Sequence, residues 1–270
     1  MGDKPEPDSS EVSGEEKPGD LIDELLADVS LDDETPERIG DARRLYHTRF
    51  KDLTVEERCA LAETGDEMVR RALSHDPLPR VITSLMSNPN FSAIEARIIA
   101  REHPSGQGLT LLAQRPTLIA DPEVRRRLLR NGHVTAPLVQ TVLRGRPLIT
   151  VHQVSMSHDV PENTKTFARQ ELRRAFAERS PDEKVALILK TEGRVLSVLV
   201  GVALDGRTIS MIVGRSSMSP MLIRNFAQWP TTPPPILSHM MRLPQVQRDK
   251  SLQQALMRHP NLPSSLKRGN

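Results

Sequence analysis

From about residue 36 onward, apolar residues recur every three or four positions in short stretches that Pro, Gly, Asn and Ser interrupt. Residues 121–143 show this pattern most completely. Asp121 and Pro122 suit a helix start, because a carboxylate accepts free backbone N–H groups and proline needs no donor there. The next apolar side chains share one helical face, namely those of Val124, Leu128 and Leu129.

The same stretch predicts where this first helix ends and the next one begins. Asn131-Gly132 is typical of a helix end, with Gly132 expected in the left-handed conformation that glycine adopts readily. Thr135 is expected to cap a second helix, whose buried face carries Leu138, Val139, Val142 and Leu143. Residues 121–143 therefore predict two short helices with a tight joint.

Related joints recur along the chain, at residues 85–92 (LMSNPNFS), 256–263 (LMRHPNLP) and, more weakly, 213–219 (VGRSSMS). The predicted cap positions are Thr54, Ser92, Thr135, Ser180, Ser219 and Pro263. Their mean separation of about 42 residues is typical of helical repeat units with two or three helices each.

Residues from about 52 to 270 resemble an α-solenoid of the HEAT/armadillo type. The L-L-x-N-P-x-x-T/S joint is similar to that of bacterial helical-repeat proteins. The resemblance implies an all-α fold, a right-handed solenoid of about five units, and a curved helical surface that binds partners. It carries over no catalytic residue.

Residues 193–214 allow two interpretations. Asp205-Gly206 lies between runs of β-branched residues and could form a hairpin turn. The repeat register instead aligns this segment with residues 69–88 and favours helices.

Charge divides the chain into two parts. Residues 1–41 hold 15 Asp/Glu and 3 Lys/Arg, a net charge of −12, whereas residues 42–270 hold 20 acidic and 34 basic residues, a net charge of +14. We therefore expect an acidic, mostly disordered arm at 1–41 and a helical repeat domain at 42–270.

Within the arm, residues 20–30 (DLIDELLADVS) predict a short amphipathic helix. Its apolar stripe consists of Leu21, Ile22, Leu25, Leu26 and Val29. Three interpretations stay open: a helix that docks into a partner's groove, an autoinhibitory segment that folds back on the basic domain, and a capping helix or solvated tail.

Composition narrows the classes of function. Aromatic residues make up only 3% of the chain, which argues against stacking platforms for single-stranded nucleic acid. The single cysteine, Cys59, excludes an internal disulfide, and we expect it to be a small buried residue. The N-terminal region lacks the apolar core of a signal peptide, and the longest apolar run, residues 195–204, is too short to span a membrane. We expect a cytoplasmic protein.

A search for catalytic motifs finds neither a Walker A loop nor an H-E-x-x-H pattern. We expect no enzyme activity, no cofactor and no metal site. The charged residues that bear most on function are the 29 arginines. The candidate partner-binding residues in a basic groove are Arg125, Arg126, Arg127, Arg130, Arg169, Arg173 and Arg174.

Such a groove could hold an acidic or extended protein segment through Arg–carboxylate pairs. It could also hold nucleic-acid phosphates by counterion release. We expect a protein-interaction scaffold or adaptor, with a sequence-nonspecific nucleic-acid binder as the alternative. The arm would provide a second contact or an autoinhibitory one.

Overall fold

The computed structural model describes residues 36–267, which form eighteen α-helices, a π-helical turn and a 3₁₀ turn, with no strand among these residues. The first half contains α2 (Pro36–Leu45), η1 (Tyr46–Phe50), α3 (Val55–Thr64), α4 (Glu67–Leu73), α5 (Pro79–Ser87), α6 (Ala93–Glu102), α7 (Gly106–Leu112), α8 (Pro116–Ala120), α9 (Pro122–Arg130) and α10 (Ala136–Leu143). The second half contains α11 (Leu148–Met156), α12 (Glu162–Glu178), α13 (Pro181–Lys190), η2 (Arg194–Ser197), α14 (Gly206–Val213), α15 (Pro220–Gln228), α16 (Pro234–Arg242), α17 (Pro244–Arg248), α18 (Lys250–Met257) and α19 (Ser264–Lys267).

The all-α prediction is confirmed for the described residues. The predicted arm helix at 20–30, with its apolar stripe, lies outside them. Because α2 begins at Pro36, the predicted boundary between residues 41 and 42 falls inside a helix.

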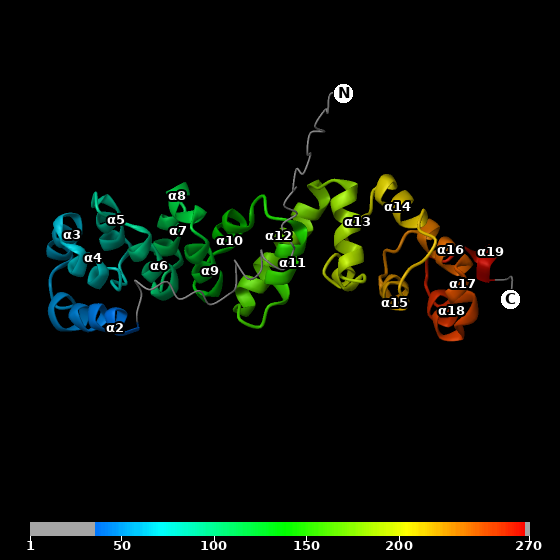
Figure 1. Ribbon diagram of the computed structural model, residues 1–270, viewed down its shortest axis with the longest axis horizontal. Coiled ribbons are helices and arrows are strands. Elements are labelled where there is room, and N and C mark those ends of the chain that lie inside the picture. Colours follow the sequence, from blue (N-terminus) through cyan, green and yellow to red (C-terminus); the bar gives the residue numbers. More distant parts are fainter. Residues whose placement is uncertain (1–35, 268–270) are drawn as a thin grey trace, which may run out of the picture.

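The helices follow one another in chain order along the long axis of an elongated molecule (Figure 1). They pack in two rows. One row is built by contacts of α3 with α5 and of α5 with α7, and the other by contacts of α4 with α6 and of α6 with α9. Leu73, Ile82, Ile99 and Leu128 belong to the core between the rows and are fully buried. Each pair of helices thus covers the apolar face of the pair before it.

The spatial repeat in the first half is shorter than the predicted 42 residues. The helices α4, α6, α9 and α11 begin after Asp66, Ser92, Asp121 and Pro147, which are 26, 29 and 26 residues apart. The predicted cap positions fall on both rows: Thr54 begins α3 in one row, whereas Ser92 begins α6 in the other. A spacing of 42 residues therefore corresponds to about one and a half helix pairs.

The joints between helix pairs are held by a buried asparagine. The Asn131 side-chain amide donates to the carbonyl oxygens of Ala100, Arg101 and His103 at 3.1–3.2 Å, and its oxygen accepts the His133 N–H at 2.8 Å. These carbonyls stand at the end of α6, where no intrahelical donor reaches them. One side chain therefore satisfies four backbone groups from two units.

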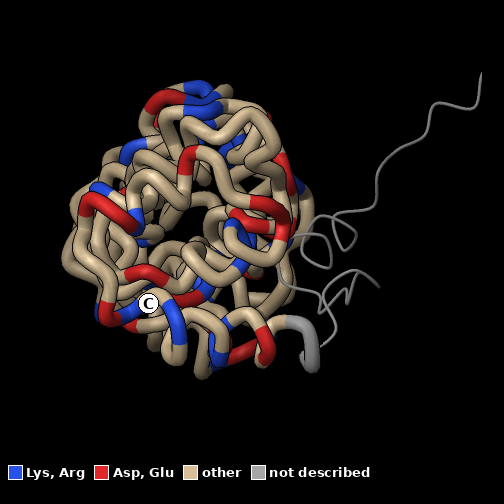
Figure 2. The backbone as a smooth tube through the Cα atoms, turned by 90° about the vertical axis from the view of Figure 1, so that its left-hand side faces the viewer, with Lys and Arg blue, Asp and Glu red and all other residues tan. Residues whose placement is uncertain are grey.

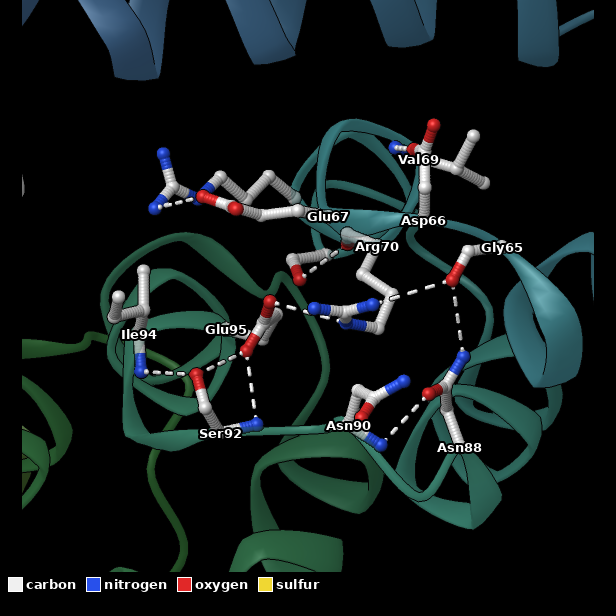
Figure 3. Close-up of polar contacts among 12 residues, drawn as sticks. Gly65, Asp66, Glu67, Val69, Arg70, Asn88, Asn90, Ser92, Ile94 and Glu95 are labelled. Carbon is white, nitrogen blue, oxygen red and sulfur yellow. Dashed lines mark hydrogen bonds and ion pairs between the residues drawn. The ribbon is translucent and has the colours of Figure 1, made fainter.

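Asn88 forms a similar joint in the other row, between the ends of α5 and α3 (Figure 3). Its amide donates to the carbonyls of Ala62 and Gly65, and its oxygen accepts the Asn90 N–H at 2.9 Å. The prediction that Gly132 takes a left-handed conformation was wrong, because the described glycines with positive φ are Gly145, Gly193 and Gly201. At this joint the asparagine side chain does what a left-handed glycine does elsewhere.

The predicted caps Thr54 and Ser92 are confirmed, and each forms a reciprocal capping box, with Glu57 and Glu95 respectively. The predicted cap Ser180 accepts the Glu183 N–H without a reciprocal bond, because the Glu183 carboxylate accepts from the Leu148 N–H at 3.3 Å. Asp205 caps α14 by accepting the Thr208 N–H at 2.8 Å, so helices and not a hairpin follow this dipeptide. Cys59 is buried, as expected.

Asn131→Ala should lower the free energy of unfolding by about 2–4 kcal/mol, because it leaves several buried backbone groups without partners. Urea denaturation followed by circular dichroism measures this loss. The matched control is Asn90→Ala at an exposed position, which should change the free energy of unfolding by less than about 0.5 kcal/mol. Equal losses in both variants would contradict the role assigned to the Asn131 amide.

Candidate functional site

The structure places two of the predicted partner-binding arginines of α9 inside the fold. Arg125 and Arg126 are only 4% and 2% exposed. Arg125 donates to the carbonyls of Ile119 and Ala120, at 2.9 and 2.6 Å, where α8 ends. The prediction that Arg125 and Arg126 lie on an open basic surface was therefore wrong, because packing buries both guanidinium groups.

The neighbouring arginines on α9 are also engaged within the chain. Arg126 and Arg127 both contact the Glu123 carboxylate, each at 2.5 Å. Arg130 is more accessible and lies 3.7 Å from Asp159. Two carboxylates, Glu123 and Asp159, thus offset part of the positive charge of this cluster.

The second predicted group lies on α12, the longest helix of the described part. Arg169 pairs with Glu162 at 2.9 Å, and Arg173 donates to the Val198 carbonyl at 2.6 Å. Arg174 contacts Glu171 and Glu178 at 2.6 and 2.9 Å. Helix α9 packs against α6 and α10, and α12 packs against α10 and α11, so α10 connects the helices that carry the two groups.

Ion pairs of this kind join helix pairs elsewhere in the first half. In Figure 3, Arg70 lies between the Gly65 carbonyl, at 3.2 Å, and the Glu95 carboxylate, at 3.4 Å. Arg97 contacts Asp121, the cap of α9, at 2.7 Å. Arginine suits these positions because one guanidinium carries five donors.

The C-terminal third has a different charge balance. Residues 191–267 hold nine Lys/Arg and three Asp/Glu, a net charge of +6. Eight exposed Lys and Arg side chains form no ion pair or side-chain hydrogen bond with the side chains described in residues 39–267, and we call them the C-terminal cations: Arg207, Arg215, Arg224, Arg242, Arg248, Lys250, Arg258 and Lys267. The sequence search missed them because they are scattered singly; a local charge count would have found them.

Seen from the α2 end of the long axis, the described chain carries both Lys/Arg and Asp/Glu segments around its outline (Figure 2). The C-terminal cations are scattered singly between residues 207 and 267, so charge alone does not define one binding site there. The structure offers a concave feature there.

A pocket of about 270 Å³ lies between η2 and α15, and we call it the notch. Its lining includes Arg194 and Val200 on one side and Asn225 and Trp229 on the other. Val200 is 50% exposed, so the notch has an apolar edge open to solvent. The indole N–H of buried Trp229 has no acceptor within residues 36–267.

The backbone around residues 192–201 shapes the notch. Glu192, Gly193 and Gly201 have φ values of 49°, 78° and 86°. At Gly193 a Cβ would lie 3.0 Å from the Asn225 Cβ, so glycine suits both the conformation and the close approach of α15. The amide of Asn225 donates to the Glu192 carbonyl at 2.7 Å and fixes the two sides together.

Helix α15 extends the apolar edge. Met221, Asn225 and Gln228 are spaced four and three residues apart and so share one face of this helix. Met221 is 40% exposed. Arg224 lies next to this face and Arg194 on the opposite side of the notch, so two cations flank an apolar surface.

A second groove runs along α10 and α12, where two pockets share Glu171 and Arg174. It contains acidic and basic side chains that already pair with each other. We take the notch as the candidate site because Val200 gives it an exposed apolar edge, whereas the second groove is lined largely by paired charges.

Within residues 36–267 no three His, Cys, Asp or Glu side chains gather as they would around a metal ion. No helix of this part combines the length and apolar character needed to cross a bilayer. No protein family, curated protein or solved structure matches the chain.

Arg126→Ala and Arg242→Ala each remove one positive charge, but we expect the first to lower stability and the second to weaken retention on a cation-exchange column. Loss of Arg126 should lower the free energy of unfolding by about 2–3 kcal/mol, because the partly buried Glu123 carboxylate keeps only part of its pairing. Loss of Arg242 should leave stability within about 0.5 kcal/mol. Arg242→Ala should instead elute from a cation-exchange column at lower salt than Arg126→Ala, since the Arg126 charge is already paired. The reverse ranking in both measurements would contradict this division.

Proposed function

We propose that this protein is a non-enzymatic interaction scaffold, a right-handed α-solenoid of the HEAT/armadillo type. In this proposal the C-terminal third binds an acidic protein segment that also carries apolar side chains. Two rows of helices in chain order support the solenoid assignment. The observation that carries the binding role is the notch, with its exposed apolar edge between Arg194 and Arg224.

The ligand class follows from the chemistry of these side chains. Carboxylates pair with guanidinium groups through short, directional hydrogen bonds. Covering the exposed Val200 and Met221 side chains with apolar groups of a ligand would stabilise the complex. An acidic peptide with Leu or Ile residues supplies both these apolar groups and the carboxylates. A nucleic-acid backbone supplies phosphates but nothing apolar for this edge, so nucleic acid stays the second possibility.

Trp229 provides the test, because it is the only tryptophan of the chain and lines the notch. An acidic peptide of Glu and Leu residues should change its fluorescence on titration, whereas oligothymidylate should not. Arg194→Glu with Arg224→Glu should weaken peptide binding by about tenfold or more, since two attractions become repulsions.

The matched control is Arg43→Glu with Arg49→Glu, the same charge change at exposed positions of α2 and η1. It should leave the affinity for the peptide unchanged. Tighter binding of oligothymidylate than of the peptide, with equal losses in both double variants, would replace the proposal by general polyanion binding. A pull-down of the full chain with nuclease present then identifies its natural partners.

A further inference from the structure

Residues 20–30 carry acidic and apolar side chains, which complement the basic and apolar side chains at the notch. They contain four acidic residues and no basic one, together with the apolar stripe of Leu21, Ile22, Leu25, Leu26 and Val29. The C-terminal third, with its net charge of +6, carries the opposite charge. The complement of the notch is thus present in the same chain, at the other end of the sequence.

The short connection to α2 prevents this segment from reaching the notch of its own chain. Five residues separate Ser30 from Pro36, and a fully extended connection between them spans at most about 22 Å. Helix α2 and helix α15 lie toward opposite ends of the long axis (Figure 1). Contacts run from α2 through α4 and α6 to α9, and from α11 through α13 and η2 to α15; because packed helices are about 8–10 Å apart, the separation of α2 from α15 is on the order of 50 Å.

We propose that the notch of one molecule binds residues 20–30 of a second copy of the chain. This inference rests on the proposed function, since it names the acidic segment that the notch takes. The segment lies as an amphipathic helix in the notch, with its apolar stripe against Val200 and Met221. Its carboxylates pair with the exposed Arg224 and with Arg194, which exchanges its surface pair with Glu192, at 3.7 Å, for the incoming carboxylate.

Such a contact joins two different surfaces, so each molecule offers one arm and one notch. Contacts of this type are head-to-tail and close into rings or continue into open chains. Assembly should therefore grow with protein concentration and weaken as salt screens the pairs. Two variants with complementary defects give the sharpest test, because together they retain one working arm and one working notch.

The experiment uses sedimentation velocity of the full chain from micromolar to submillimolar concentration. Wild type should associate, whereas Leu25→Asp with Leu26→Asp, and Val200→Asp with Met221→Asp, should each stay monomeric. An equimolar mixture of the two double variants should form a one-to-one dimer and nothing larger. The matched control, Leu78→Asp with Met156→Asp, changes two equally exposed apolar residues elsewhere, 36% and 55% exposed, and should associate like wild type.

A monomeric wild type at every concentration overturns the proposal, as does a mixture that fails to associate. These failures remain distinct from failure of the proposed function. If the full chain stays monomeric while the Glu-Leu peptide still changes Trp229 fluorescence, the notch binds acidic segments of other proteins only. If the peptide also fails to bind, both proposals fall together.

Discussion

Short helices set the main physical problem of this fold. Most helices of the described chain have ten residues or fewer, and each helix end leaves carbonyls that no N–H of the same helix reaches. A buried carbonyl without a partner loses its bonds to water and gains nothing in return. Asn88 and Asn131 solve this problem at two joints by donating to the free carbonyls of the preceding unit. Packing of the rows depends on these bonds, because without them the joints could not be buried.

Arginine extends the same solution to the rest of the first half. Arg125 satisfies carbonyls at the end of α8, and Arg70 joins a carbonyl to a carboxylate across two helix pairs. Each of these side chains brings a positive charge into the fold, and an acidic side chain usually accompanies it. In the C-terminal third the neutral Asn261 amide takes such a place and donates to the Pro230 and Thr232 carbonyls.

Local features of the fold were predictable from sequence, and features that depend on packing were not. The capping boxes at Thr54 and Ser92 involve residues three positions apart, so the sequence contains the whole interaction. The 42-residue period was wrong because caps of both rows look alike in sequence. Arg126 looked available because its position on α9 says nothing about which helices cover it. The notch depends on the positive φ at Glu192 and Gly193, and a glycine after a helix end indicates only the second of these.

The segment that forms the notch also interrupts one row of helices. Between α13 and α15 this row contains only η2, four residues long, where other positions hold seven or more. A 3₁₀ turn has poorer hydrogen-bond geometry than an α-helix and is a common place for a hinge. When opposite ends of the molecule are pulled or bent, deformation should therefore concentrate at η2. The elasticity of the whole array would then be set by one short turn.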